Sequence, residues 1–395
     1  MNIIQLTETH FPEAIHLSEY AFQYQVPEEE RKGRLERLKQ HRIFGVVEDG
    51  VVAAKAHLIP FEIYLEGEPL RMGGIGSVAT YPEYRRQGYV KGLLAHLLAV
   101  MKEEGQTVSM LHPFSVSFYR KYGWELITDY CRSVYAKSDL VPLQPAPDGI
   151  IRRCTKASHS ADLEQVYDRF ARRHAGMLKR STDRWLHAVY GNRFAAVYYD
   201  EEKKPQGYML YEVKESRMKV KEFAPLNGEA RVGLWNFICQ HDSMVDQVEL
   251  WAAPDEPLNF ALRNPRITRE ATPLIMGRIV DAEAFLARYP FQWQGVDEAL
   301  ILHIGDPYAE WNNISVSLQD GGMKVIARGT SPDADANAAA DHELRLSIPA
   351  LTTLLFSYRR PDELRQLGML HGSGAAVAKL ERLIPRLQPF FYDMF

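Results

Sequence analysis

Apolar side chains recur at steps of three and four residues over positions 90–101, the clearest hydrophobic pattern in the chain. This spacing predicts an amphipathic helix with one buried face. A strand-like run at 74–79 precedes it, and Arg85-Arg86-Gln87-Gly88 stands where the helix begins. A buried helix start does not need arginines. They suit a site for an anion, because a helix N-terminus presents unpaired N–H groups and a partial positive charge.

The pattern around that helix predicts a mixed α/β unit in the first third of the chain. Gly123 follows a short helical run, as is typical of a helix C-terminus. Strands are expected at 2–6, 44–58, 62–65, 74–79, 107–111 and 124–135, with a turn at 66–68. Other helices are expected at 13–24, 27–40 and 115–122.

A second unit follows a stretch rich in proline and glycine at 142–149, which is typical of a domain boundary. Two helices, paired strands, a strand, a helix and a strand then recur between 150 and 252 in the order of the first unit. Where the first unit has its arginines and glycine, the second has the loop 224–230. This order predicts a duplicated fold whose second copy has lost the anion site.

The pattern of predicted strands and helices changes again near Pro290. This change predicts three domains, at 1–145, 146–287 and 288–395. In the last domain, Asp320-Gly321-Gly322 is a hairpin signal between two alternating runs. The chain ends in the aromatic run 389–395, and such an end is expected to pack inside. Strands are expected at 299–304, 314–318, 323–327 and 344–348, and helices at 351–357, 361–370 and 375–383.

Composition narrows the function classes. The 395 residues are 46% hydrophobic and 25% charged, with a formal net charge of −4. The chain therefore lacks the basic excess typical of nucleic-acid-binding proteins. Its three cysteines form neither a disulfide framework nor a zinc pattern, and we expect no metal. We find no signal peptide and no membrane span in the sequence, so we expect a cytoplasmic protein without a nucleic-acid or membrane partner.

Two motifs together point to a cofactor. Arg85 to Gly88 can bind a pyrophosphate, because glycine lets the backbone approach closely and arginine makes charge-assisted contacts. Phe118-Tyr119 and Gly123-Trp124 form a second motif about thirty residues later. The pair resembles the GCN5-related N-acetyltransferase superfamily, whose Arg/Gln-x-x-Gly-x-Gly/Ala loop holds the pyrophosphate of acetyl-CoA. Val90 departs from that loop, which prefers a second small residue there.

Val90 does fit the motif of a narrower family. The enhanced intracellular survival protein (Eis-like) acetyltransferases are similar here, because their Arg-Arg-x-Gly is followed by a bulky apolar residue. The resemblance covers the whole chain. It implies an α/β fold with tandem acetyltransferase domains, the second degenerate, and a C-terminal α/β domain like sterol carrier protein. It also implies acetyl-CoA as co-substrate, a small-molecule amine acceptor and a homo-oligomer, which in this family is a hexamer.

The resemblance also implies roles for individual residues. Tyr119 matches the tyrosine that protonates the departing thiolate, and the C-terminal carboxylate of Phe395 matches the general base. Phe114 and Ser115 should line the cofactor near its thioester. The remaining cofactor-binding positions are Val78, Ala79 and Thr80 for the pantetheine arm, and Arg85, Arg86, Gln87, Gly88, Tyr89, Val90 and Lys91 around the pyrophosphate.

Elementary chemistry supports both catalytic assignments. A tyrosine hydroxyl, with an ordinary pKa of about 10, can supply the proton that the thiolate needs. Many superfamily members take their base from a glutamate on the strand before the helix. Here residues 73–78 read Gly-Gly-Ile-Gly-Ser-Val, without a carboxylate, so the base must come from elsewhere. Tyr122 is the rival of Tyr119, and His112 is an alternative base, although a histidine at a strand end is more often structural.

Several acidic and aromatic residues have two possible roles. Glu28-Glu29-Glu30 and Asp129 would form an acidic mouth that attracts a cationic amine, or simply a solvated face. Trp124 and Phe22 would line an acceptor pocket or pack in the core. The leading hypothesis is N-acetylation of polycationic, aminoglycoside-like amines by direct attack in a ternary complex. The alternatives are a protein lysine acetyltransferase and a lipid-binding protein whose acetyltransferase unit is vestigial.

Overall fold

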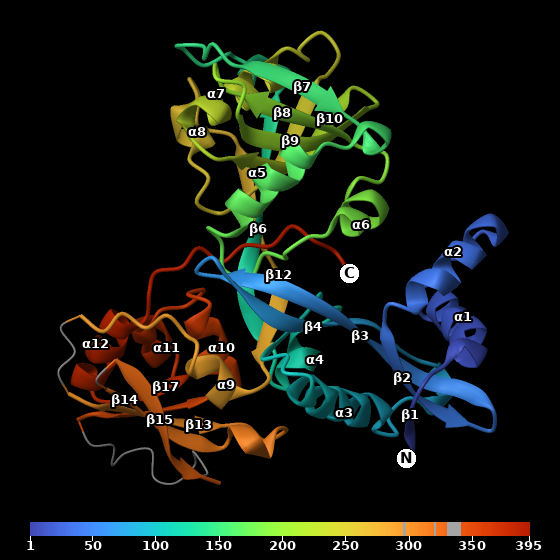
Figure 1. Ribbon diagram of the computed structural model, residues 1–395, viewed down its shortest axis with the longest axis vertical. Helices are drawn as coiled ribbons and strands as arrows, with labels where there is room; N and C mark the ends of the chain where they lie inside the picture. Colours follow the sequence, from blue (N-terminus) through green and yellow to red (C-terminus); the bar gives the residue numbers. More distant parts are fainter. Residues whose placement is uncertain (295–297, 320, 330–340) are drawn as a thin grey trace.

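The computed structural model describes residues 1–294, 298–319, 321–329 and 341–395. In this part of the chain, the strands form a twelve-stranded sheet that runs through the first and second units and a five-stranded sheet near the C-terminal end. Figure 1 shows the three regions grouped around a crossing point, next to which the C-terminus lies. The predicted mixed α/β class is confirmed.

Helices pack on opposite faces of the first unit's sheet. In β2 (Arg42–Glu48), Phe44 and Val46 join the core under α3 (Tyr89–Glu103), whereas Ile43 packs with α1 (Phe11–Phe22). Successive side chains of a strand point to opposite faces, so both faces are covered. The other elements of this unit are β1 (Ile3–Gln5), α2 (Glu28–Leu38), β3 (Val51–Leu65), β4 (Glu68–Thr80), β5 (Val108–Leu111), α4 (Val116–Arg120) and β6 (Glu125–Ala136).

The strands predicted at 44–58 and 62–65 are wrong in their limits. A turn at Asp49-Gly50 separates β2 from β3, and β3 then continues through Pro60 to Leu65. Pro60 lies beyond Leu58, the last residue of β3 that pairs with β2. Edge positions tolerate a residue without an N–H group, so the proline does not end the strand.

The second unit repeats the order of the first. Its first helix packs on β9 and β10, and α7 precedes β11, which pairs in parallel with β10. The elements are β7 (Ile150–Cys154), α5 (Ala161–Ala171), α6 (Thr182–Arg184) with a further helical turn to Val189, β8 (Phe194–Tyr199), β9 (Pro205–Lys214), β10 (Arg217–Pro225), α7 (Gly228–Cys239), β11 (Gln247–Ala252) and α8 (Leu258–Ala261).

Two long strands, β6 and β12 (Thr268–Ile279), join the two units. β12 inserts into the first unit, where Met276–Ile279 pair with β5 and Thr268–Gly277 pair with β6. β6 in turn pairs with β11 of the second unit through Cys131–Ala136. Figure 1 shows both strands crossing between the units. The sequence pattern does not predict β12, because its first half is exposed, lacks alternation and contains Pro273.

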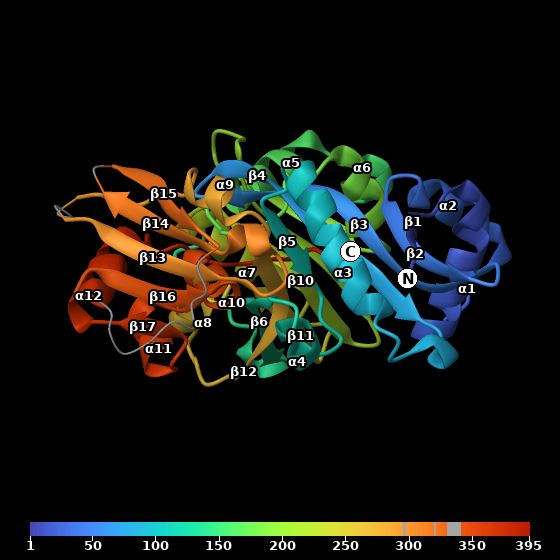
Figure 2. The same cartoon turned by 90° about the horizontal axis from the view of Figure 1, so that it is seen from below.

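The third region docks against the first unit, as the view from below shows (Figure 2). A fully buried ion pair between Arg278 of β12 and Asp306, at 2.6 Å, ties the two together. Gly321 and Gly322 lie at the predicted hairpin, and Asp320 lies outside the described residues. The elements are α9 (Ala282–Leu286), β13 (Leu300–Gly305), β14 (Ile314–Gln319), β15 (Gly322–Arg328), β16 (Glu343–Ser347), α10 (Ile348–Leu355), α11 (Pro361–Gln366), β17 (Leu370–Gly372) and α12 (Gly374–Leu383).

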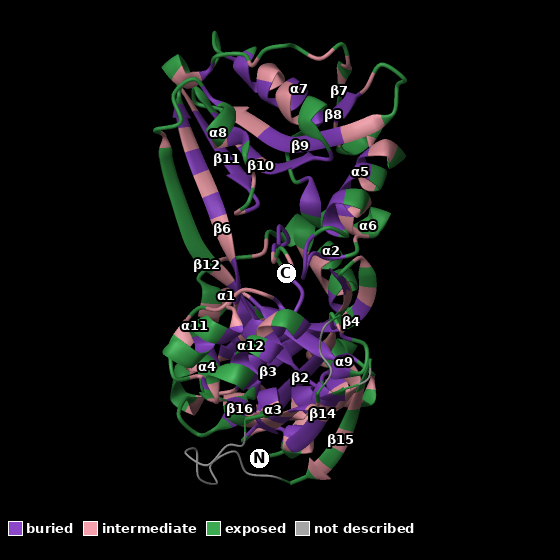
Figure 3. Ribbon diagram, turned by 90° about the vertical axis from the view of Figure 1, so that its left-hand side faces the viewer, coloured by how far each residue is buried: buried purple, intermediate pink, exposed green. Residues whose placement is uncertain are grey.

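Burial follows these layers. Figure 3 shows buried segments in the strands and exposed segments on the outer helices and on the first half of β12. One hydrophobic cluster contains side chains of both β4 and α10, so the third region and the first unit share a core. In the described part of the chain, none of the helices combines the length and the hydropathy needed to cross a bilayer.

Candidate active site

The β4 strand separates from its parallel neighbour at the predicted pantetheine site. β4 pairs with β5 only from Met72 to Ile75, whereas its other edge pairs with β3 as far as Thr80. Ser77 lies at a register shift on that second edge, with φ of +49°. Among the described residues, no strand therefore pairs with the part of β4 beyond Ile75 on the side of β5. This stretch contains the predicted residues Val78, Ala79 and Thr80.

Helix α3 begins at an open N-terminus. Its N-cap is Gly88, in the left-handed conformation with φ of +82°, and no side chain of the described residues caps the helix there. A Cβ atom on Gly88 would meet nothing within 4 Å. Arg85, Arg86 and Gln87 are exposed beside it. The first-turn N–H groups and two guanidinium groups are therefore accessible to an anion.

The other predicted cofactor residues differ in how accessible they are. Tyr89 is buried, and its hydroxyl donates to a carboxylate of β2 at 2.9 Å. Ser115 caps α4 by accepting a backbone N–H at 3.3 Å, and Val90 packs partly into the core. Lys91 is exposed, and Phe114 is 72% exposed, which is unusual for a phenylalanine. Lys91 and Phe114 are thus open to a ligand, whereas the side chains of Tyr89 and Ser115 are already engaged.

The corresponding places in the second unit are closed. The N-cap of α7 is Asn227, whose Oδ1 accepts the N–H of Ala230 at 2.8 Å. The pairing of β10 with β11 ends at Val220, as that of β4 with β5 ends early. Beyond it, the hydroxyl of Tyr392 bonds the N–H and the carbonyl of Phe223, each at 3.0 Å. A residue of the chain end thus lies where the first unit leaves a gap.

Tyr119 lies in α4, beneath Phe114. Its side chain is 3% exposed, and its ring contacts Phe114 and Phe118 at centroid distances of 5.4 and 5.2 Å. Burial raises the pKa of Tyr119 to about 12, so its hydroxyl stays protonated at neutral pH. Within the described residues, this hydroxyl has no hydrogen-bond partner. The rival Tyr122 is half-buried against Tyr308 of the third region.

The chain end reaches β4 from the far side of the molecule. A Cβ atom on Gly76 would lie 3.6 Å from the carboxyl carbon of Phe395, and one on Gly74 would lie 2.9 Å from its ring. The glycines of this strand therefore make room for the terminal residue. The Phe395 ring also packs against Phe61 and His112, at centroid distances of 5.0 and 5.4 Å.

A buried ion cluster holds the tail in this position. Asp393 is 4% exposed and accepts hydrogen bonds from Arg180 at 3.0 Å and from Arg184 at 2.7 Å. Arg180 also binds both carboxylate oxygens of Glu222 on β10, at 2.7 and 3.0 Å. Burial opposes ionisation of Asp393, but the two arginines outweigh it and hold the pKa of this carboxyl below its ordinary value of 3.8. The tail is thereby anchored to the second unit.

His112 is engaged with the same tail. Its Nε2 lies 3.0 Å from the carbonyl oxygen of Asp393, so this nitrogen must be the donor. Its Nδ1 is buried without a partner, and burial lowers the pKa of the ring. The donating nitrogen cannot accept a proton from a substrate, and the buried Nδ1 does not line the cavity described below. His112 is thus better suited to holding the tail than to acting as the base.

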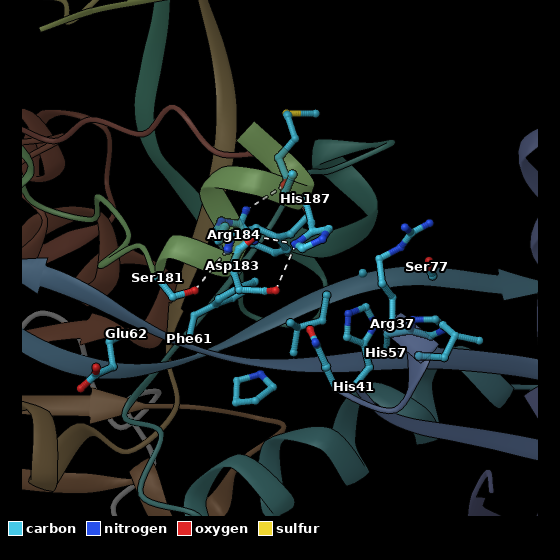
Figure 4. A pocket seen from close by; sticks show the side chains of 18 of the residues that line it. Arg37, His41, His57, Phe61, Glu62, Ser77, Ser181, Asp183, Arg184 and His187 are labelled. Carbon is cyan, nitrogen blue, oxygen red and sulfur yellow. Dashed lines mark hydrogen bonds and ion pairs between the residues drawn. The ribbon is translucent and has the colours of Figure 1, made fainter. Parts of the chain in front are cut away.

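A cavity of about 1660 Å³ lies in front of the chain end. α2, β3, the far part of β4, the segment 181–188 and the last two residues bound it. Figure 4 shows Arg37, His41 and His57 near Ser77, with Arg184 across from them. Among the described residues, no group of three or more His, Cys, Asp and Glu side chains could hold a metal ion.

The residues expected at an acidic mouth or an acceptor pocket do not line this cavity. Asp129 instead accepts a hydrogen bond from Tyr358 at 2.7 Å. Trp124 is fully buried in the core beside Tyr119, and Phe22 is 48% exposed on α1. The glutamates of 28–30 lie in the first turn of α2, outside the cavity lining. These residues thus lie outside the lining of this cavity, and the exposed glutamates fit the solvated-face interpretation.

Protein-family comparison agrees with this architecture. Residues 2–127 match an acetyltransferase (GNAT) domain family, and residues 176–279 match a second acetyltransferase (GNAT) domain family. Residues 282–392 match a sterol carrier protein domain family. The chain contains two GNAT acetyltransferase domains in tandem, followed by a sterol carrier protein domain. GNAT domains use acetyl-CoA as the acetyl donor.

Other proteins resemble this acetyltransferase along most of their length. A probable N-acyltransferase from Enterococcus faecalis V583 has 27% identity and a TM-score of 0.89, over 100% of this chain and 99% of that one. Eis1 from Mycobacterium abscessus has the same fold, with a TM-score of 0.81 and 19% identity over 100% of both chains. An uncharacterized N-acetyltransferase from Streptomyces griseus is 23% identical over 362 residues, 83% of each chain.

The acetyltransferase holds functional candidates that the sequence pattern did not indicate. One signal was available: an aspartate within a buried aromatic tail needs a charged partner. Nothing local marks that partner, because the two arginines lie 209 and 213 residues away. The candidates that the structure adds are Arg180, Arg184 and Asp393 at the tail, and Arg34, Arg37, His41, Lys55 and His57 beside the cavity.

Proposed function

We propose that this acetyltransferase modifies amines with the terminal carboxylate of Phe395 as its general base. The observation that carries the proposal is the location of the chain end, which packs against Gly76 on the wall of a large cavity. Gly76 stands two residues before Val78, where the cofactor site is predicted. On this proposal the chain is Eis-like, with domains at 1–145, 146–287 and 288–395, and assembles as a homo-oligomer, a hexamer.

The open features of the first unit fit acetyl-CoA. The backbone of Val78, Ala79 and Thr80 would hold the pantetheine arm at the free edge of β4, and Phe114 and Ser115 would lie near the thioester. Residues Arg85 to Lys91 would hold the pyrophosphate at the N-terminus of α3. Acetyl-CoA, when bound, supplies the thioester that is attacked, and a backbone N–H near Val78 would polarise its carbonyl group.

Each remaining step belongs to a named side chain or terminus. At neutral pH an aliphatic amine is protonated and has no lone pair to donate. The Phe395 carboxylate accepts one proton from it, and the amine nitrogen then bonds to the thioester carbon. As the carbon–sulfur bond breaks, Tyr119 gives its hydroxyl proton to the departing sulfur. The attached nitrogen then loses its second proton, which returns to the Tyr119 oxygen. The products are an amide, the free thiol of CoA and one proton, held at first by the Phe395 carboxylate.

The acceptor that we propose is a small molecule with one or more amines, of the polycationic, aminoglycoside-like class. The cavity volume supports an acceptor of several rings, because typical ligand pockets have only about 300–1,000 Å³. A lysine side chain of a protein would undergo the same chemistry and stays an alternative.

The experiment moves the terminal carboxylate without changing the chain before it. One variant adds a single glycine after Phe395, which converts this carboxyl into an amide and displaces the charge. Its matched control, Phe395→Leu, keeps the carboxylate and loses the ring. We expect thiol release from acetyl-CoA, with a panel of amines, to fall roughly 100-fold or more in the extended chain, in the range of general base catalysis. Phe395→Leu should keep most of the activity.

Two results would count against the proposal. Undiminished thiol release by the extended chain would mean that the base lies elsewhere. No thiol release from the wild-type enzyme with any amine of the panel would reject amine acetylation itself.

A further inference from the structure

Positive side chains gather on one side of the cavity. Arg34 and Arg37 of α2 both line it, and neither has a carboxylate within 4 Å among the described residues. The polar contact recorded for Arg34 is the hydroxyl of Tyr24, at 3.4 Å. Arg37 is exposed at the cavity wall (Figure 4). Arginine side chains that share a pocket without a counter-ion suit an anionic ligand.

A third cation lies buried behind them. Lys55 on β3 is 1% exposed, and its Nζ bonds Ser18 at 2.6 Å and His57 at 3.0 Å. It has no carboxylate within 4 Å among the described residues. Buried lysines are rare unless they are paired, because taking an uncompensated charge out of water costs free energy. Burial, and after it Arg34, lowers the pKa of Lys55 to about 7.

The hydrogen bonds of Lys55 fix the orientation of the next two side chains. Protonated Lys55 can only donate, so Nε2 of His57 accepts and its Nδ1 carries the proton. That Nδ1 lies 3.2 Å from Nδ1 of His41, which must then accept, so the proton of His41 is on Nε2. His41 lines the cavity, and its Nε2–H has no partner among the described residues. The chain of bonds ends in a free donor on the cavity side chain.

The acids that line the cavity are mostly engaged with cations of their own. Each of four lies within 4 Å of a neighbouring base, and the fifth, Glu103, is on the last turn of α3. Arg184 is likewise held by Asp393. Burial and then Arg34, Lys55, Arg184 and Arg37 lower the pKa of His41 to about 4, which keeps this ring neutral. The paired acids are Glu36 with Lys39, Glu62 with Lys179, Glu104 with Arg42 and Asp183 with His187.

We infer that the acceptor carries an anionic group, a carboxylate or a phosphate, besides its amine. Arg37, Arg34 and the Nε2–H of His41 bind this group, while the amine faces the Phe395 carboxylate. The inference rests on the proposed amine acetylation and changes the acceptor class: an amine that also carries an anion takes the place of a polycation, because molecules with amines alone would leave these three donors unpaired. The anion would also supply the counter-charge that Lys55 lacks.

The test compares amines that differ only at the far end. The first pair is 4-aminobutyrate and 1,4-diaminobutane, and the second is 2-aminoethyl phosphate and 2-aminoethanol. We expect kcat/KM from thiol release to favour the anionic member of at least one pair, and the pair that responds identifies the anion. Arg37→Gln should lower that kcat/KM about tenfold or more, as expected for loss of a charge-assisted bond, and should not lower the value of the other member. The control Lys32→Gln removes a charge from the same helix outside the cavity lining and should change neither.

A binding measurement decides the case if none of the four amines is turned over. Inorganic phosphate is titrated calorimetrically into enzyme saturated with CoA, so that the site at α3 is already filled. Phosphate binding that weakens at least tenfold in Arg37→Gln supports the anion site. No binding to the wild-type enzyme overturns it. Turnover that favours 1,4-diaminobutane and is indifferent to Arg37→Gln overturns it as well, while leaving amine acetylation intact.

Discussion

The Tyr119 side chain is buried, but its hydroxyl oxygen keeps some contact with solvent and has no hydrogen-bond partner among the described residues. Burial also raises the pKa of Tyr119 to about 12, which makes its hydroxyl a reliable donor and a poor base. An unpaired donor beneath the exposed ring of Phe114 is understandable if its partner is a ligand.

We therefore expect Tyr119→Phe to lower kcat for thiol release roughly 100- to 10,000-fold, the range of general acid catalysis. Its free energy of unfolding, measured with urea, should change little, because no bond within the described chain is lost. Tyr122→Phe is the matched control, three residues along and outside the proposed chemistry, and should keep its activity. Equal losses in both variants would contradict the role of Tyr119.

At the scale of elements, the two units differ at the N-terminus of the corresponding helices, α3 and α7. α3 begins at a glycine with no cap, whereas α7 begins at an asparagine that caps its own helix. A side-chain cap satisfies N–H groups that would otherwise be available to an anion. The second copy has thus gained local stability where the first keeps an open site.

Gly88→Ala tests the open start of α3. Its φ of +82° costs a residue with a Cβ atom about 1–2 kcal/mol, although no atom stands in the way. We expect the loop to relax and the Kd for acetyl-CoA, measured calorimetrically, to rise several-fold. Gly50→Ala has the same strain at φ of +81° with nothing within 4 Å, in the β2–β3 turn. It should lose similar stability and keep its affinity, and a matching loss of affinity there would contradict the prediction.

Elements with a strong local pattern were predictable, and elements fixed by partners far along the chain were not. The buried positions of α3 recur at helical spacing, so its limits and its arginine-rich start follow from the sequence. β12 has no such pattern, because its exposed half is held by its neighbour β6 rather than by burial. The cavity shows the same limit: Arg34 and Arg37 lie in a charged segment that looks solvated, and only the fold brings them to the same cavity as His57 and the chain end.

At the scale of the whole molecule, the second unit serves as the anchor of the tail. Tyr392 fills its strand gap, Arg180 and Arg184 hold Asp393, and Glu222 binds Arg180 from the other side. The anchored residues, Tyr392 and Asp393, precede Phe395 in the chain, and the carboxylate of Phe395 lies against the first unit. A copy without an open cofactor site can still determine where the proposed base stands, which explains why it remains packed into the same sheet.

Asp393→Asn should therefore impair both stability and catalysis. The variant leaves two arginines with a neutral partner, and breaking a buried ion pair costs about 3–5 kcal/mol. We expect a lower free energy of unfolding in urea and a lower kcat, together with faster release of the last residues by a carboxypeptidase. The matched control Asp242→Asn changes an exposed aspartate of the second unit, outside the cavity lining, and should leave all three unchanged. Normal kcat in Asp393→Asn would mean that the tail position does not depend on this cluster.

The stability that Asp393 contributes should also depend on pH in a defined direction. Because the folded pKa of Asp393 is below its unfolded value of about 3.9, its contribution to stability is complete above that value and is lost as pH falls through the folded pKa. The difference in unfolding free energy between wild type and Asp393→Asn should be constant from pH 7 to about pH 5. It should then narrow steadily in more acidic solution, because the wild-type carboxyl becomes neutral too. A difference that widened with acid would require Asp393 to be protonated in the native protein, and the ion cluster could not then be what places the chain end.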